Sequence, residues 1–229
     1  DHRDLHSFPT RRSSDLRMSA PLIKQFGTVP IHTHILKSVL EDYKAPMARI
    51  ARLQKKGQLL NLRRDLYICL PEEGSPSREL IANHLLHPSY VSYETVLSAK
   101  GVIPERVHTT KSACMKRNKV FENATGRYEY LHVSDAYFPI GLIKQTTNEG
   151  YCYISASTEK ALCDLIISFP NLRIQSVKAM RFYLENYLKT DWNIISNMDT
   201  SIIRACAETT NKKKNELKLL EKAICYERV

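Results

Sequence analysis

The residues with the most distinctive chemistry are basic side chains gathered in one short stretch of the chain. No acidic residue lies between Met47 and Arg64. Cations grouped in this way attract polyanions, of which nucleic acid comes first and an anionic membrane surface second. The candidate DNA-binding residues are Lys44, Arg49, Arg52, Lys55, Lys56, Arg63 and Arg64.

A short helix is expected to position the first of these cations. Met47, Ile50 and Leu53 recur at helical spacing and predict an apolar side, and Gly57 predicts the end of the helix. The opposite side is expected to be basic and to carry Arg49, Arg52, Lys55 and Lys56.

A hairpin with a basic tip is expected directly after this helix. Two apolar runs, residues 59–62 and 66–70, are separated by Arg63, Arg64 and Asp65. A second amphipathic helix, capped by Thr33, is expected to precede the basic one. Helix, basic helix and basic hairpin follow one another in this order in a winged helix. The alternative is a surface helix whose charges are only solvated.

The composition is that of an ordinary globular protein with an excess of positive charge. The chain has 229 residues, of which 43% are hydrophobic and 25% charged, and its formal net charge is +10. This length allows one large or two modest domains. The six cysteines show no metal-ligand spacing and are expected to be reduced thiols. Because no apolar run approaches the roughly 20 residues that span a bilayer, we expect a cytoplasmic protein without a membrane partner.

The first seventeen residues show neither helical nor strand periodicity. The run DHRDLHSFPTRRSSDLR resembles translated sequencing-adapter read-through, so residues 1–17 are interpreted as a non-native tail with Met18 as the natural start. The alternative is a native basic arm that enters a minor groove. A winged helix is then expected over residues 18–75, with the boundary at the EEGSP segment, residues 72–76.

The remainder, residues 76–229, is expected to combine helices with a sheet. Ser77, Ser92 and Ser157 are predicted helix caps, and further helices are expected near residues 176–188, 199–208 and 212–226. Short strands between residues 107 and 154 predict an antiparallel sheet. We therefore predict an α+β fold with an N-terminal winged helix-turn-helix. Aromatic residues of this region could stack on single-stranded nucleic acid, but half-buried strands also favour tyrosine: Tyr128, Tyr130, Tyr137, Phe138, Tyr151 and Tyr153.

Several segments resemble a known family. Residues 49–72, RIARLQKKGQLLNLRRDLYICLPE, look like the winged-helix segment of AbiEi-type antitoxins, with Asp65 where that family has glycine. Asp tolerates a left-handed turn better than most residues, so the hairpin is still expected to form. Residues 88–94 and 101–105 look like the opening of the antitoxin domain. Residues 157–164, STEKALCD, are similar to a further family motif, with Thr158 in place of proline.

The resemblance implies a function that composition and spacing do not. It implies a transcriptional autoregulator that binds double-stranded DNA at its own promoter. It also implies the antitoxin of a bacterial abortive-infection (type IV) toxin–antitoxin system, opposing a nucleotidyltransferase toxin without needing a stable complex with it.

No enzymatic motif stands out in the sequence. A glycine-rich phosphate loop, a G-x-S-x-G elbow and an H-E-x-x-H helix are all absent. Glu159, Lys160 and Asp164 form the best acid-containing cluster, which is expected to serve helix capping and surface pairing. We therefore expect no catalysis, no metal ion and no cofactor. The alternatives are an RNA- or protein-binding module and a metal-dependent nuclease.

Overall fold

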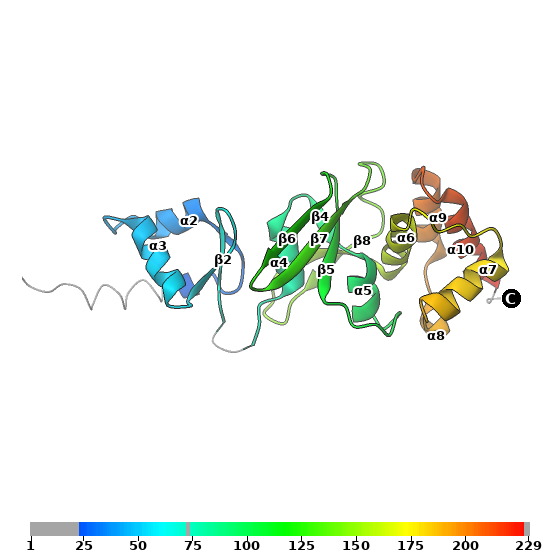
Figure 1. The fold of residues 1–229 in the computed structure, drawn as a ribbon, viewed down its shortest axis with the longest axis horizontal. Helices are drawn as coiled ribbons and strands as arrows, with labels where there is room; N and C mark the ends of the chain where they lie inside the picture. The colour runs from blue at the N-terminus through cyan, green and yellow to red at the C-terminus, as the bar shows by residue number, and fades with distance from the viewer. Residues whose placement is uncertain (1–22, 72–73, 227–229) are drawn as a thin grey trace, which may run out of the picture. The chain divides into compact units, whose positions relative to one another are not determined.

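The chain forms two compact units, which join at Pro76 and Ser77 (Figure 1). The computed structural model describes residues 23–71 and 74–226, so the predicted tail of residues 1–17 lies outside the described residues. The boundary predicted after residue 75 lies next to the observed division. Within the described ranges, no helix has both the length and the apolar character needed to cross a membrane.

The described part of the first unit includes the helices α2 and α3 and a small antiparallel sheet of strand order β1-β3-β2. The short helix and the hairpin predicted from the sequence are both present, and Pro46 occupies the first turn of that helix, where its missing N–H costs no hydrogen bond. The elements are β1 (Ile31–His32), α2 (Thr33–Val39), α3 (Pro46–Lys55), β2 (Leu59–Arg63) and β3 (Leu66–Cys69).

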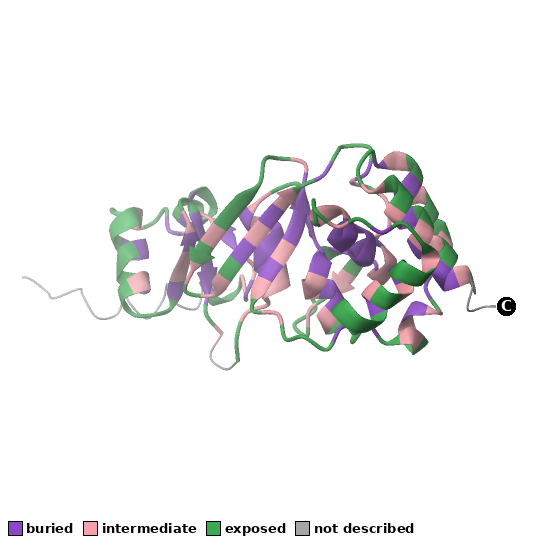
Figure 2. Ribbon diagram, turned by 45° about the vertical axis from the view of Figure 1, so that its right-hand side comes forward, coloured by how far each residue is buried: buried purple, intermediate pink, exposed green. Residues whose placement is uncertain are grey.

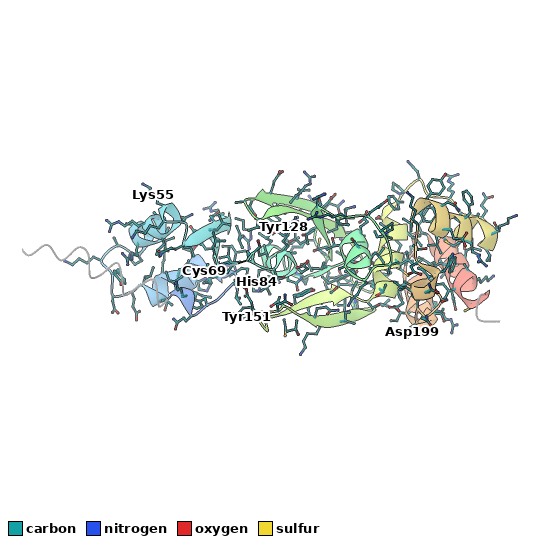
Figure 3. The ribbon with its side chains drawn as sticks, turned by 90° about the horizontal axis from the view of Figure 1, so that it is seen from below. Lys55, Cys69, His84, Tyr128, Tyr151 and Asp199 are labelled. Carbon is teal, nitrogen blue, oxygen red and sulfur yellow. The ribbon has the colours of Figure 1, made fainter. Side chains whose placement is uncertain are left out.

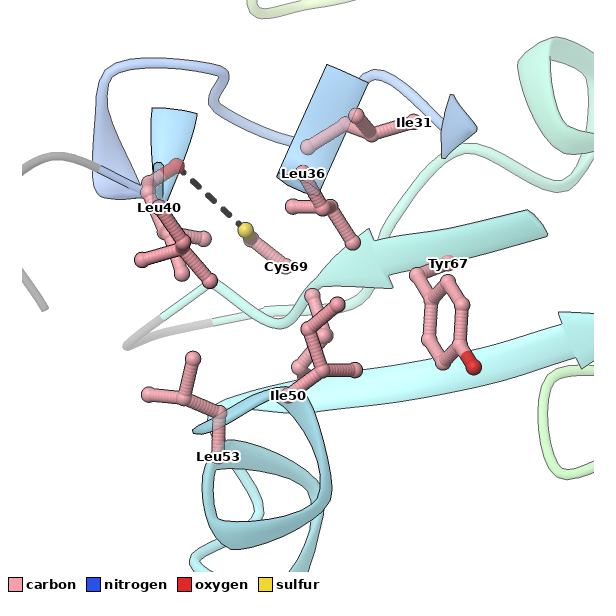
Figure 4. Packing of buried hydrophobic residues seen from close by; sticks show 9 residues of the cluster. Ile31, Leu36, Leu40, Ile50, Leu53, Tyr67 and Cys69 are labelled. Carbon is pink, nitrogen blue, oxygen red and sulfur yellow. Dashed lines mark hydrogen bonds between the residues drawn. The ribbon is translucent and has the colours of Figure 1, made fainter. Parts of the chain in front are cut away.

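Apolar side chains from both helices and the sheet meet in the core of this unit (Figure 4). Leu36 and Leu40 come from the α2 segment, and Ile50 and Leu53 from α3. Cys69 of β3 lies among them, its thiol donating a hydrogen bond to the carbonyl oxygen of Ile23 at 3.4 Å. Burial raises the pKa of this thiol to about 11. Cys69 is therefore a protonated core residue.

The second unit is organised around a six-stranded sheet of order β6-β7-β5-β4-β9-β8. The pairs β5–β7 and β4–β9 are parallel and the other pairs antiparallel, so the prediction of an antiparallel sheet was wrong. The β4–β9 pair arises because β4, a three-residue strand too short to show alternation, lies between β5 and β9, and the β5–β7 pair arises because β7, and not β6, lies beside β5. The strands are β4 (Ser89–Val91), β5 (Thr109–Cys114), β6 (Lys119–Asn123), β7 (Gly126–His132), β8 (Leu142–Thr146) and β9 (Cys152–Ala156).

Helices of very different burial accompany this sheet. Residues on every side of α6 are buried (Figure 2), whereas most residues of α7 and η1 are partly or fully exposed. The predicted helix 176–188 is observed as α7 continued by the π-helical segment η1. The helices are α4 (Arg78–Leu85), α5 (Tyr93–Ala99), α6 (Thr158–Ser168), α7 (Val177–Phe182), η1 (Tyr183–Tyr187), α8 (Trp192–Ile195), α9 (Thr200–Thr209) and α10 (Lys214–Tyr226).

Two of the four predicted serine and threonine caps are confirmed. The hydroxyls of Ser77 and Ser157 accept hydrogen bonds from backbone N–H groups in the first turns of α4 and α6. Ser92 occupies the N-cap position of α5 but makes no capping bond, and its hydroxyl donates to Asp164. Thr33 is the first helical residue of α2 and not its cap, which is His32.

Candidate nucleic-acid interface

Most of the predicted cations of the α3 region are exposed. Arg52 and Lys55 lie on the outer side of α3, and Lys55 projects away from the rest of its unit (Figure 3). Lys56 follows the helix and Lys44 precedes it, both exposed. The first turn of α3 contains no acidic residue. This part of the surface therefore carries positive charge without a neighbouring carboxylate on the same helix.

Arg49 does not belong to this exposed set, which corrects the prediction that placed it on the basic side. Its side chain is 5% exposed, and its guanidinium carbon lies 5.1 Å from the centroid of the Tyr43 ring. Met47, predicted on the apolar side, is 48% exposed. The buried stripe thus runs through residues 49, 50 and 53. An arginine suits this position because its aliphatic stem covers apolar surface while the guanidinium stacks on an aromatic ring.

The two arginines at the tip of the β2–β3 hairpin differ in how far their side chains are exposed. The Arg64 side chain is 96% exposed, with its Nε 3.8 Å from an oxygen of Asp65. An exposed ion pair of this kind holds its partners only weakly. Arg63 is half-buried, and its Nη1 donates to the backbone oxygen of Arg64 at 3.4 Å. Arg64 is therefore the accessible cation of the tip, and Arg63 helps to shape the turn.

Asp65 takes the left-handed conformation that the sequence predicted for it, with φ at 63°. Its backbone oxygen accepts a hydrogen bond from the N–H of Thr33 at 3.1 Å. The Thr33 hydroxyl donates to its carboxylate at 3.3 Å. These two bonds join the hairpin turn to the start of α2, so the tip is held in place by the body of the unit.

A buried polar cluster in the second unit corrects the prediction for Lys160 and Asp164. They were expected to pair on the surface, but both side chains are completely buried, with Nζ and Oδ1 3.5 Å apart. Asp164 also accepts hydrogen bonds from the hydroxyls of Ser92 at 2.6 Å and Tyr137 at 2.8 Å. The Lys160 ammonium donates to the backbone oxygen of Tyr137 at 3.0 Å. Both carboxylate oxygens thus have partners inside the protein.

The electrostatics of this cluster follow from its burial. Burial lowers the pKa of Lys160, and the charge of Asp164 opposes that change. Burial likewise raises the pKa of Asp164, against the effects of Lys160, Ser92 and Tyr137. Since the Lys160 ammonium is inaccessible and satisfied by protein groups, the cluster is suited to fixing α6 in the fold and not to contacting a ligand through Lys160.

Other predicted sites have structural roles in this arrangement. Glu159, the residue of the nuclease alternative, accepts a hydrogen bond from the Asp199 N–H at 3.2 Å beside the start of α9. Among the described residues, no group of three or more histidine, cysteine or acidic side chains is placed to hold a metal ion. Tyr128, Tyr130 and Tyr137 are buried, so these rings cannot form the stacking platform of the RNA-binding alternative.

The comparisons with known proteins add little to this geometry. No protein-family model matches the sequence, and no curated protein sequence matches it. Among solved structures, the crystal structure of the RV2827C protein from Mycobacterium tuberculosis is similar, with 11% sequence identity, 96% of this chain and 82% of that chain covered, and a TM-score of 0.49. A likeness of this degree carries no argument about function.

Proposed function

We propose that this protein is a DNA-binding transcriptional regulator whose first unit acts as a winged helix. The observation that carries the proposal is the exposed basic side of α3, followed directly by a hairpin with Arg64 at its tip. Accessible cations without neighbouring acids suit a phosphate backbone, which carries most of the affinity of a protein for DNA.

The dimensions of the two elements also favour a duplex. A major groove about 12 Å wide admits an α-helix, whose diameter with side chains is about 10–12 Å, and the ten residues of α3 place about 15 Å of helix along it. The five residues of β2 extend the tip roughly 16 Å beyond the turn that follows α3. A helix in the groove therefore leaves the hairpin tip within reach of the adjacent backbone or minor groove.

Each cation then has a distinct role. Arg52, Lys55 and Lys56 enter or flank the major groove, while Arg64 approaches phosphates or the neighbouring minor groove. Lys44, in the connection before α3, is a phosphate contact. Arg49 and Arg63 act within the fold, the first by packing under α3 and the second by supporting the turn.

The antitoxin part of the proposal rests on the sequence resemblance alone. Residues 88–94, 101–105 and 157–164 support it. The DNA target is then the promoter of the protein's own gene, and the second unit opposes a nucleotidyltransferase toxin in the cytoplasm without forming a stable complex. Co-expression with a nucleotidyltransferase encoded beside this gene tests that part, and unrelieved growth arrest would reject it.

Mobility-shift titrations with the upstream DNA at several salt concentrations test the interface. We expect Arg64→Ala to weaken binding to all sequences and to lower the salt slope by about one unit. We expect Arg52→Ala to cost about 1–3 kcal/mol of binding free energy and to relax one base position. Lys144→Ala, which removes an exposed lysine of β8, is the matched control and should change neither. Unchanged binding in both arginine variants would reject the interface.

The same titrations separate the alternatives. Preference for single-stranded RNA over duplex DNA would favour an RNA-binding module. Magnesium-dependent cleavage of the probe that Glu159→Ala abolishes would favour a nuclease.

A further inference from the structure

A separate pocket of about 720 Å³ with a mixed polar and apolar lining lies within the second unit. Its walls come from the end of β7, the start of α5, the last turn of α6 and the turn before α10. Leu131, Val133 and Ile167 supply apolar surface, and Asn118, His132 and Lys212 are among the polar lining residues. The lining also includes two acids, Asp164 and Glu216, which are paired with Lys160 and Lys213. A cavity of this size accommodates a small organic molecule, and it is larger than a bare inorganic anion requires.

Two basic runs that are far apart in the sequence meet at this pocket. One is the Lys116-Arg117-Asn118-Lys119 loop before β6, and the other is the run of three lysines at residues 212–214. Asn118 lines the pocket from the first run, and Lys212 and Lys213 line it from the second. Lys116, Arg117 and Lys212 are exposed, and the side chains of these three make no ion pair with any described residue. Of these three, Lys212 lines the pocket and is available to a ligand there, and Lys116 and Arg117 directly precede the lining residue Asn118 in the chain.

Lys213 has a different task from its neighbour Lys212. Its ammonium donates to the backbone oxygens of Pro170 and Leu172 and lies 3.8 Å from Glu216. These contacts hold the turn before α10 against the end of α6. Lys213 thus stabilises the turn on which Lys212 lines the pocket.

Asn118 and His132 are held together at the opposite wall. The side-chain oxygen of Asn118 accepts a hydrogen bond from the His132 backbone N–H at 2.7 Å. Because the oxygen is used in this way, the amide nitrogen of Asn118 remains as a donor. The pocket thus offers an amide, an imidazole and an ammonium group, all of which can donate to anionic oxygens.

The backbone around the pocket gives an independent indication of a ligand site. Four non-glycine residues in the described part of the chain have positive φ, and two of them, Tyr93 at 57° and Lys213 at 55°, line this pocket. Such conformations cost about 1–3 kcal/mol each and concentrate at ligand sites. Tyr93 is also nearly buried beside Asp164, so the floor of the pocket is shaped by the polar cluster of α6.

We propose that this pocket binds a nucleotide carrying two or three phosphates. The phosphates contact Asn118, His132 and Lys212, and the nucleoside lies against Leu131, Val133 and Ile167. This site lies entirely within the second unit and shares no residue with the proposed DNA interface. It gives the second unit a small-molecule ligand, which the proposed regulator does not require.

Isothermal titration calorimetry of the full chain with ATP and GTP tests the proposal. We expect at least one of them to bind. Lys212→Glu should weaken that binding about tenfold or more, and a tenfold change corresponds to 1.4 kcal/mol of binding free energy. Lys222→Glu, an equal charge reversal at an exposed position of α10, is the matched control and should leave nucleotide binding unchanged. Absence of binding at millimolar nucleotide, or equal weakening in both variants, would overturn the proposal.

Further arms identify the ligand and separate this site from the DNA interface. Tripolyphosphate should bind more weakly than the nucleotide, because it cannot use the apolar wall; equal binding would overturn the nucleotide assignment. Preference for a single-stranded oligonucleotide with the same sensitivity to Lys212→Glu would overturn it too.

His132→Ala, compared at equal thermal stability, gives a second side-chain test. The variant carrying both Arg52→Ala and Arg64→Ala should retain nucleotide binding even where DNA binding is lost.

Discussion

Two helices of this molecule carry the same kinds of charged residue under opposite conditions. On α3, Arg52 and Lys55 face solvent, whereas on α6 the Lys160 ammonium is completely buried against Asp164. A solvated cation keeps its hydration and can exchange it for a phosphate at little cost. A buried pair has lost that hydration, so each partner depends on the other. The difference shows that position in the fold, and not residue type, decides whether a cation serves recognition or stability.

Removing one partner of the buried pair should have the largest effect. We expect Asp164→Ala to lower the free energy of unfolding by about 3–5 kcal/mol, because it leaves the Lys160 charge uncompensated in the interior. Urea denaturation of the full chain measures this loss. Glu122→Ala is the matched control: it removes the carboxylate of the exposed Arg127–Glu122 pair and should cost no more than about 1 kcal/mol.

A double variant sharpens the same prediction. Lys160→Met combined with Asp164→Leu removes both charges and should be more stable than Asp164→Ala alone. If the double variant lost as much stability as Lys160→Met alone and Asp164→Leu alone lose together, the charges would not be coupled, and the contrast between the helices would be lost.

A smaller effect is expected at the turn of the hairpin. Asp65→Val places a β-branched residue at a φ of 63° and removes the bond from the Thr33 hydroxyl, so we expect a loss of about 1–3 kcal/mol in the stability of the first unit. Asp65→Asn retains both the conformational tolerance and an acceptor and serves as the control. Thermal unfolding of the two variants measures the difference, and equal melting temperatures would contradict the role assigned to this residue.

The smallest effect should distinguish the two arginines of α3. Arg49→Ala removes a guanidinium packed on Tyr43, and we expect a loss of stability of about 0.5–2 kcal/mol. Arg52→Ala should leave stability within about 0.5 kcal/mol, because its side chain is exposed. Chemical denaturation of both variants provides the comparison. A larger loss of stability for Arg52→Ala would reverse the assignment of the two side chains.

Sequence periodicity predicted α3 but not the orientation of every residue on it. Met47 and Arg49 both fit a stripe that contains Ile50 and Leu53, and hydrophobicity alone favours methionine. The structure buries the arginine, because Tyr43 provides a ring on which its guanidinium stacks. That contact involves a residue outside the helix, so no pattern within α3 could have predicted it.

The apolar residues around Lys160 and Asp164 indicated that this part of α6 is buried, but the spacing of the two charges suggested an exposed ion pair. Lys160 and Asp164 are four residues apart, as in an ordinary exposed helical pair. The residues between and after them, however, are almost all apolar: Ala161, Leu162, Cys163, Leu165 and Ile166. A helix that is apolar on every side is usually buried. The strand β4 gave no such signal, since three residues do not establish a period.

The central position of β4 sets an order of assembly during synthesis. Val91 of this strand pairs with Ser155 of β9, 64 residues further along the chain. The middle of the sheet therefore cannot close before β9 has left the ribosome, whereas the strands described in the first unit, β1 to β3, are complete by Cys69. Because pairings between distant residues form slowly, the amino-terminal unit matures first and the sheet of the second unit follows.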